Sequence, residues 1–524
     1  MRLWLLTTLV VALAVAGAAV AALLAWPRGT LEGSRSGLAH VSLPGFAGEV
    51  ESVQAAGSGG RPVPVVLRDG TVFPLGSLAQ GVRLRVTVRI RRPSWIGWLI
   101  GRRATRTLAL VTPSVQPTAR VLSPSRGAPV VVRFSAPVAR VRVGQKRPRT
   151  LSSPSSSVPL GRVAEGTASS GTLSVAAAAR PWELLGKPVR VTWFVRGMKP
   201  QAQLVTAPAG GAVLAPAQPL TLTFSRPVAD VFGSRLPRLD PATPGNWTQA
   251  DAHTLVFQPG AFGFPLGGTL HVRLPQPALV GGRSTRVLTW HVREGSELRL
   301  QQLLARLDYL PVRWRGSSDP PKSPAGELAA AVSPPAGSFS WRYPNVPAPL
   351  RALWKEGQAN EITRAAVMAF EDGHGLATDG IAGPHVWRAL LQDDLAGRRH
   401  TGGYSYVFVH ATVPESLNLW HDGKVVLTSP GNTGIPAAPT PYGTWPVFEH
   451  ITVGTMSGTN PDGSHYNDPG VRWISYFHGG DAIHAFPRAS YGTPQSLGCV
   501  ELPESAAAQV WPYTPIGTLV TVEA

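Results

Sequence analysis

The chain contains one cysteine, Cys499, and a histidine, His484, lies 15 residues before it. A thiolate is a strong nucleophile, but a free thiol with a pKa near about 8.5 is only slightly ionised at neutral pH. A neighbouring imidazole can accept the thiol proton and leave the reactive thiolate. Pro487, Gly492 and Pro494 lie between the two residues, so the chain can reverse and bring them together. We therefore predict a Cys/His pair for acyl transfer, although a lone cysteine is more often a small buried hydrophobe.

Strand and turn signals dominate the segment that carries this pair, from residue 400 onward. Segments 404–413 and 417–427 are predicted strands, and Asp422-Gly423 predicts a turn within the second. The other histidines of the segment lack the close pairing of a metal site, so no metal and no other cofactor is expected. These histidines are His410, His421, His450, His465 and His478.

The motifs of this segment are similar to those of a known enzyme family. The family has a His followed, a little over a dozen residues later, by Ser/Thr-His-Gly-Cys. The matching residues are His484 and Ser496-Leu497-Gly498-Cys499, with Asn432-Thr433-Gly434, Pro439-Thr440-Pro441-Tyr442-Gly443 and Phe477-His478-Gly479-Gly480-Asp481 upstream. Because of these matches, residues 403–523 resemble the YkuD-type catalytic domain of L,D-transpeptidases. The resemblance implies a β-sandwich-like domain over 400–524, with its site under a loop flap.

The resemblance also implies roles for single residues. Cys499 would attack the carbonyl that joins the L-centre of diaminopimelate to the terminal D-Ala of a peptidoglycan stem, with His484 as general base and then acid. Backbone N–H groups near Gly498 would receive the oxyanion, and Ser496 would support the cysteine loop by a hydrogen bond. An amine of a second stem would then take the acyl group from the thioester. The product is a 3→3 cross-link in cell-wall biogenesis.

Three further residues are candidates for the substrate-binding cleft. Tyr476 would form cleft wall, His478 would line the cleft, and Arg488 would meet substrate carboxylates. Each residue also fits a structural role: sheet core for Tyr476, packing for His478 and surface charge for Arg488.

Two positions depart from the family pattern. Leu497 stands where the family has His, and Glu501 stands where Asn or Arg often follows the cysteine. The nucleophile and the base remain, so catalysis is expected. The same acyl-enzyme resolved by water would make an L,D-carboxypeptidase. A wall-binding scaffold without activity is an alternative of another class, and a zinc D,D-peptidase is the remaining one.

Composition limits the classes of fold and partner. The 524 residues suit several domains, and 56 glycines with 51 prolines favour β modules over long helices. A net charge of +19 favours anionic partners. Residues 1–26 are almost wholly apolar and predict a transmembrane anchor or signal, which places the remaining chain outside the cytoplasm. The expected partners are the stems and glycan of peptidoglycan and, through the N-terminal helix, the cytoplasmic membrane; no nucleic acid is expected.

The N-terminal part divides into a predicted linker and a basic β region. Residues 27–45 are rich in Gly, Ser and Arg and predict a tether. Within 46–116, apolar residues from 82 to 90 alternate with Arg and Thr, which predicts a half-buried strand with a basic outer face. Trp95 and Trp98 follow. An amphipathic hairpin on a membrane surface, with a rim of arginines, is the alternative.

The middle of the chain contains an internal repeat and then helical signals. A Phe-Ser-x-Pro-Val phrase begins at Phe134 and again at Phe224, 90 residues later. It resembles bacterial immunoglobulin-like domains and predicts two β modules, 117–205 and 206–295, as spacers.

Residues 296–395 resemble the type 1 peptidoglycan-binding module, a small three-helix domain. Asn360 is a predicted helix cap, Pro384 suits the first turn of another helix, and a Pro/Gly/Ser-rich insertion over 316–338 departs from the family. The remaining matches are Leu307-Asp308-Tyr309-Leu310, Thr363-Arg364-Ala365-Ala366-Val367 with Phe370, and Asp379-Gly380-Ile381 with Gly383 and Trp387. The expected fold class is multidomain and mainly β: immunoglobulin-like β modules, this helical domain and a C-terminal YkuD-like β-sandwich.

Overall fold

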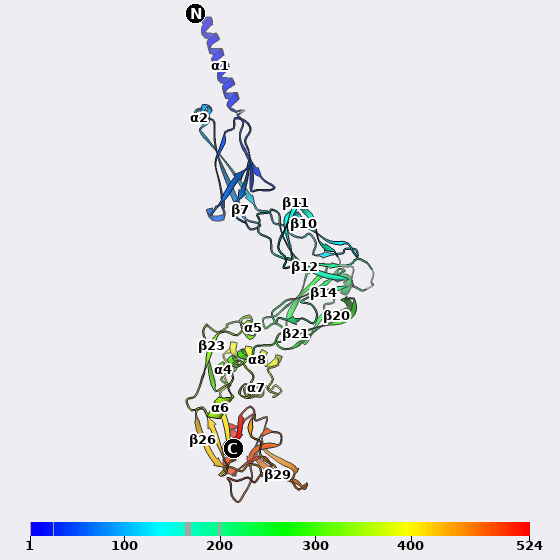
Figure 1. Ribbon diagram of the computed structural model, residues 1–524, viewed down its shortest axis with the longest axis vertical. Helices are drawn as coiled ribbons and strands as arrows, with labels where there is room; N and C mark the ends of the chain where they lie inside the picture. Colours follow the sequence, from blue (N-terminus) through cyan, green and yellow to red (C-terminus); the bar gives the residue numbers. More distant parts are fainter. Residues whose placement is uncertain (1, 25, 163–168, 198–200) are drawn as a thin grey trace. The chain divides into compact units, whose positions relative to one another are not determined.

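The computed structural model describes residues 2–24, 26–162, 169–197 and 201–524 (Figure 1). The chain divides into two compact units. The first comprises Met1–Val205, Thr223–Pro227 and Ala278–Ser284, and the second comprises Thr206–Leu222, Val228–Pro277 and Thr285–Ala524.

The described chain begins with helix α1 (Arg2–Leu24). Among the described residues, no helix is both long enough and apolar enough to cross a membrane. The structure therefore leaves the predicted anchor over residues 1–26 unsupported.

Two four-stranded sheets follow α1. The predicted alternation in β7 is confirmed, because Leu84, Val86, Val88 and Ile90 are buried while the arginines between them are exposed. One sheet has the order β1-β2-β6-β5 and the other β4-β3-β7-β8. Their elements are β1 (Thr30–Gly33), β2 (Ala39–Ser42), β3 (Glu49–Gly57), η1 (Ser58–Gly60), β4 (Pro62–Val63), β5 (Val65–Arg68), β6 (Thr71–Pro74), β7 (Arg83–Arg91), α2 (Ser94–Ile100) and β8 (Arg103–Val111).

Residues 27–45 are part of this fold, and their prediction as a tether is wrong. They supply β1 and β2, which pair in antiparallel register. Leu38, Ala39 and Val41 are buried among the core residues of the two sheets. The prediction rested on the Gly, Ser and Arg content of the segment and overlooked a short apolar stretch that forms part of the core.

The two predicted β modules differ from each other. Strands β9 to β13 of the first module form one five-stranded sheet, β11-β10-β12-β13-β9, so the expected two-sheet sandwich is not confirmed there. The long strand β10 pairs with both β11 and β12, so a single sheet accommodates them. The strands are β9 (Val121–Leu122), β10 (Pro129–Val143), β11 (Arg149–Arg162), β12 (Ser170–Ala178) and β13 (Val189–Phe194).

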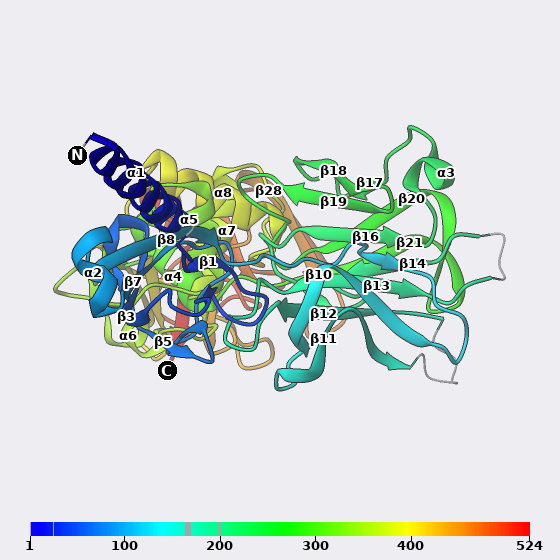
Figure 2. The same ribbon diagram turned by 90° about the horizontal axis from the view of Figure 1, so that it is seen from above.

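The second module has two four-stranded sheets (Figure 2). Their orders are β14-β16-β19-β18 and β15-β21-β20-β17, and the buried indole of Trp290 lies on β21. The elements are β14 (Leu204–Ala207), β15 (Val213–Leu214), β16 (Leu220–Phe224), α3 (Val228–Phe232), β17 (Arg238–Asp240), β18 (Gly245–Asp251), β19 (Thr254–Pro259), β20 (Thr269–Val280) and β21 (Arg283–Val292).

Residues 296–395, all of them described, contain five helices where three were expected. The predicted caps are confirmed: the Thr363 N–H donates to Asn360 Oδ1 over 3.0 Å, and α8 begins at Pro384. The insertion is an ordered part of the bundle, because Glu327 in it forms a buried ion pair of 2.6 Å with Arg299. The elements are α4 (Glu297–Arg306), β22 (Val312–Gly316), α5 (Pro324–Val332), β23 (Gly337–Trp341), α6 (Ala348–Leu353), α7 (Glu361–Gly373) and α8 (Pro384–Ala396).

This helical region shares its core with the C-terminal sheet. Tyr406, Trp420 and Leu519 of the sheet belong to the same buried cluster as the apolar residues of α4, α7 and α8. A Cβ on Gly517 would lie 2.5 Å from the carbonyl oxygen of Ala365, so α7 approaches the chain before β32 closely. The helices therefore support the sheet through a shared apolar core.

The C-terminal region has two sheets with a common apolar core. The predicted strands over 404–413 and 417–427 correspond to β24 and to β25 with β26. The sheet orders are β26-β25-β24-β32-β27 and β28-β29-β30-β31. The elements are β24 (Ser405–His410), β25 (Ser416–His421), β26 (Lys424–Pro430), β27 (Gly443–Pro446), β28 (Glu449–Thr459), β29 (His465–His478), β30 (Asp481–Ala485), β31 (Val500–Leu502), α9 (Glu504–Val510), η2 (Trp511–Tyr513) and β32 (Leu519–Glu523).

Candidate active site

The strand register places Cys499 beside the strand that carries His484. Strands β30 and β31 are parallel, with Ile483 opposite Val500 and His484 opposite Glu501. Cys499 directly precedes Val500, and its Sγ lies 3.8 Å from the carbonyl oxygen of Gly480, just before β30. Residues 15 positions apart in the sequence thus lie on or next to neighbouring strands of one sheet.

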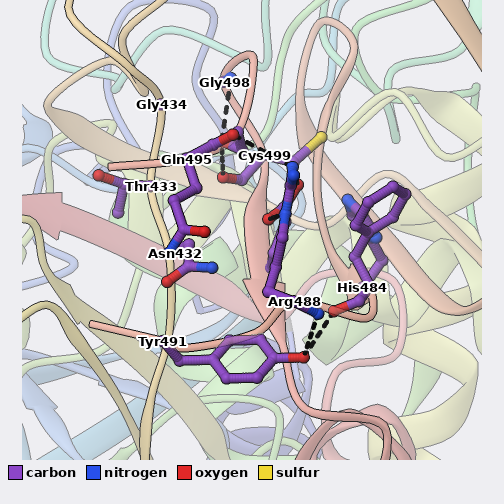
Figure 3. Close-up of polar contacts among 12 residues, drawn as sticks. Asn432, Thr433, Gly434, His484, Arg488, Tyr491, Gln495, Gly498 and Cys499 are labelled. Carbon is purple, nitrogen blue, oxygen red and sulfur yellow. Dashed lines mark hydrogen bonds and ion pairs between the residues drawn. The ribbon is translucent and has the colours of Figure 1, made fainter. Parts of the chain in front are cut away.

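Both side chains line one cavity of about 400 Å³. The long hairpin of β28 and β29 supplies part of its wall, and the loop that carries the cysteine supplies another part. Figure 3 shows the labelled residues of this region. The cavity is lined by Met456, Asn460, Tyr466, Asp468, Gly480, Asp481, His484, Phe486, Arg488, Gln495, Ser496, Leu497, Cys499 and Glu501.

The surroundings of the thiol hold it in its neutral form. Burial raises the pKa of Cys499 to about 12, and the charges of Asp481 and Glu501 add to the rise, while a hydrogen bond from the backbone of Ala482 opposes it. A thiol with this pKa needs a base within the site to become a nucleophile at neutral pH.

His484 lines the same cavity as the thiol and is the candidate for that base. It is 3% exposed, and burial lowers the pKa of its imidazole. Its Nδ1 lies 3.0 Å from the carbonyl oxygen of Ala485. A carbonyl only accepts, so Nδ1 carries the hydrogen of the neutral ring and Nε2 is left as a proton acceptor. The imidazole is therefore neutral at pH 7 and oriented by the backbone.

Hydrogen bonds hold the cysteine loop in one shape. Ser496 Oγ donates to the carbonyl of Cys499 over 2.6 Å and accepts from the Gly498 N–H over 3.2 Å. Thr440 Oγ1 donates to the carbonyl of Gly498 over 2.8 Å. An oxyanion expected at the Gly498 N–H would therefore compete with Ser496 for this donor. Gly498 has a φ of 120°, and a Cβ there would lie 2.2 Å from Asp481 Oδ1, so the position requires glycine.

The three predicted substrate-binding residues have different surroundings. Among the described residues, the lining of the cavity does not include Tyr476 or His478. The ring of Tyr476 stacks on Phe448 with centroids 6.2 Å apart, and His478 Nδ1 lies 3.0 Å from a carboxylate oxygen of Asp481. Arg488 does line the cavity.

The guanidinium of Arg488 is already bound by a carboxylate of the protein. Its Nε and one terminal nitrogen donate to the two oxygens of Glu501 over 2.8 and 2.7 Å. The side chain of Glu501 is 5% exposed, so Arg488 neutralises a buried charge. Its backbone N–H donates to Tyr491 Oη, which in turn donates to the carbonyl of Phe486 (Figure 3). The structure thus pairs Arg488 with the unusual residue Glu501.

Replacing Arg488 with Met is expected to lower the free energy of unfolding by about 3 kcal/mol, because it leaves the Glu501 carboxylate buried and unpaired. Urea unfolding followed by tryptophan fluorescence measures the change. The matched control is Arg472→Met, which breaks an ion pair with Glu504 whose side chains are both more than half exposed and is expected to cost less than about 1 kcal/mol. Equal stability of the two variants, with a raised KM for Arg488→Met alone, would mean that Arg488 serves substrate binding instead.

Several cavity residues were not named as site residues from the sequence. Met456, Asn460, Tyr466 and Asp468 reach the cavity from the hairpin of β28 and β29, far before the cysteine in the chain. Asp481 lies between the His478 ring and the cysteine loop, and burial raises the pKa of its carboxyl. The positions of the four hairpin residues at the cavity follow only from the pairing of β28 with β29, which the sequence motifs do not show. Among the described residues, no group of three or more His, Cys, Asp or Glu side chains is arranged to hold a metal ion.

A cysteine and an oriented neutral histidine on one cavity are the parts of an acyl-transfer site. Residues 405–522 match the YkuD family, the L,D-transpeptidase catalytic domain. The chain therefore contains a YkuD L,D-transpeptidase catalytic domain, which implies an enzyme of the acyltransferase type.

Solved structures of L,D-transpeptidases are similar to this chain. An L,D-transpeptidase from Mycobacterium smegmatis is 16% identical, with a TM-score of 0.21, and the match covers 62% of this chain and 100% of that one. The catalytic domain of the Enterococcus faecium L,D-transpeptidase acylated by ertapenem is 29% identical, with a TM-score of 0.21, over 24% of this chain and 99% of that one. L,D-transpeptidase 3 from Mycobacterium tuberculosis is 14% identical, with a TM-score of 0.21, over 62% and 99%. No curated protein matches the chain.

Proposed function

We propose that the chain is an L,D-transpeptidase that forms a thioester between Cys499 and a peptidoglycan stem and passes the acyl group to an amine of a second stem. The observation that supports this proposal is the shared cavity of Cys499 and His484 within the matched catalytic domain. The proposed substrate lies outside the cytoplasmic membrane, so the enzyme is proposed to act there. Attachment through residues 1–26 and glycan binding by 296–395 stay predictions.

In the first half-reaction, His484 Nε2 takes the thiol proton as Cys499 Sγ bonds to the carbonyl carbon next to the terminal D-Ala. The tetrahedral intermediate collapses when the C–N bond breaks, and the imidazolium returns the proton to the leaving D-Ala amine. The thioester keeps the acyl group activated, so no nucleotide is needed.

In the second half-reaction, the amine of another stem attacks the thioester carbonyl. His484 accepts a proton from that amine, the C–S bond breaks, and the thiol receives the proton. Three carboxylates, Asp468, Asp481 and Glu501, line the cavity together with the single arginine Arg488. This lining attracts a positively charged amine, which releases one proton to solvent before its neutral form attacks, and so favours an amine acceptor over water.

The test is product analysis by liquid chromatography and mass spectrometry, with the full chain and a purified disaccharide-tetrapeptide. We expect a cross-linked dimer that has lost one D-Ala, formed at the same rate with and without a chelator. A stem whose side-chain amine is acetylated is the control and is expected to give no dimer. A shortened stem without any dimer would identify an L,D-carboxypeptidase instead. No change in the stem would favour the wall-binding scaffold, with Leu497 as the first residue to replace by His.

A further inference from the structure

The turn between β7 and β8 exposes two large aromatic side chains. It consists of residues 91–103 with the short helix α2, and we refer to it as the tip (Figure 1). Trp95 is 59% exposed and Trp98 is 76% exposed. Trp98 Nε1 donates to the carbonyl oxygen of Trp95 over 2.9 Å, so the polar group of this indole is satisfied within the tip. Large apolar side chains that lie together on a surface and have polar residues around them often mark a site that binds a membrane or another protein.

Arginines surround these indoles. Arg91 and Arg103, whose side chains are 66% and 68% exposed, face each other across β7 and β8. Arg102 is exposed beside Arg103. Arg92 donates to the carbonyl oxygens of Ile100 and Gly101, which fixes the end of α2. The tip therefore places a cationic rim directly around an apolar surface.

Two glutamates reduce the positive charge of the rim without cancelling it. Glu49 lies 3.2 Å from Arg91, and Glu51 lies 2.6 Å from Arg103. These two ion pairs do not involve Arg92 and Arg102, so the tip keeps a net positive charge. The ring of Trp26 also packs against Trp95, with centroids 5.3 Å apart, so the chain that follows α1 is part of the same surface.

We propose that the tip docks on the surface of an anionic lipid bilayer. In this arrangement the Trp95 and Trp98 rings enter the region between headgroups and acyl chains, and the arginines meet the headgroup phosphates. Charge complementarity and the indoles together determine this choice of partner. A phosphate-rich or glycan wall polymer would pair with the arginines but would leave the apolar face of α2 without an apolar phase.

The docking also has a use that is independent of the proposed chemistry. A contact between the tip and the bilayer would limit the orientations that the N-terminal sheets can take on the membrane surface. It requires no particular reaction at Cys499, so the two proposals stand or fall separately.

The test places an environment-sensitive fluorophore (NBD) at the tip of the full chain. Cys499→Ser removes the native thiol, and Trp98→Cys supplies the only labelling site. The control is Val111→Cys in the same background, which is 56% exposed and pairs with Arg83 at the opposite end of the same strands. Any contribution of α1 to binding is the same in both labelled proteins.

With vesicles of equal parts phosphatidylglycerol and phosphatidylcholine, we expect the label at 98 to shift to the blue and to be quenched by brominated acyl chains. The label at 111 is expected to stay in water. Vesicles of phosphatidylcholine alone are expected to bind the tip about tenfold more weakly, because they lack the net negative charge. A label at 98 that stays in water while the protein sediments with the vesicles would overturn the proposal.

A second variant separates the two chemical components of the tip. Trp98→Ser, at a side chain that is 76% exposed, is expected to leave thermal unfolding unchanged and to weaken binding to anionic vesicles about tenfold. A label at 98 that responds to purified wall polymer and not to vesicles would assign the rim to that polymer and also overturn the proposal.

Discussion

Replacement of Cys499 by alanine is expected to abolish covalent modification of the protein by a carbapenem. The strained β-lactam amide acylates a thiolate, and Cys499 is the single cysteine of the chain. Intact-mass spectrometry of the full chain is expected to show one adduct on the wild type and none on Cys499→Ala. The expected change in acylation is complete, because no second thiol can replace the first.

Cys499→Ser is the matched control for shape. A serine hydroxyl can keep the contact with the Gly480 carbonyl that the thiol makes, but a hydroxyl ionises far less readily and is a weaker nucleophile. No adduct on this variant, with unchanged thermal unfolding, would tie acylation to the sulfur itself. An adduct that persists on both variants would place the nucleophile elsewhere and contradict the assignment. A wild type that folds and forms no adduct would favour the scaffold.

The common cavity of Cys499 and His484 was predictable because both residues lie in one short stretch with turn residues between them. The motif also located Ser496, whose hydroxyl bonds Gly498 and Cys499 in the structure. The cavity wall from β28 and β29 was not predictable in this way. Met456 and Tyr466 come to the cavity through a long antiparallel pairing that has no motif of its own.

The sequence also did not reveal which charged side chains form ion pairs. Arg488 and Glu501 each looked like an isolated feature, one a possible substrate ligand and the other a departure from the family. The parallel register of β30 and β31 places Glu501 opposite His484, and Arg488 lies where it can neutralise this carboxylate. The helices over 296–395 show the same limit, because local caps were visible while the core shared with Tyr406 and Leu519 was not.

His484→Gln is expected to slow acylation at pH 7 by about a hundredfold to ten-thousandfold, the usual contribution of a general base. At this pH a thiol with a pKa of about 12 is ionised in only about one molecule in a hundred thousand. Gln keeps the volume of the buried ring and can donate to the Ala485 carbonyl, but it cannot take the thiol proton. The matched control is His421→Gln, whose ring bonds Ser405 outside the cavity, and it is expected to acylate at the wild-type rate.

The acylation rate is expected to depend on pH differently in the wild type and in His484→Gln. Burial lowers the pKa of His484 below its ordinary value of 6.5, so the imidazole stays a competent base until the pH falls through that lowered pKa. The wild-type rate is therefore expected to be flat around neutrality and to halve only below pH 6.5. In His484→Gln the rate depends on the few thiolates present, so it should rise about tenfold per pH unit from pH 7 to 10. Stopped-flow acylation by a carbapenem measures both profiles. A wild-type midpoint above pH 6.5, or the same flat profile in the variant, would show that His484 is not the base.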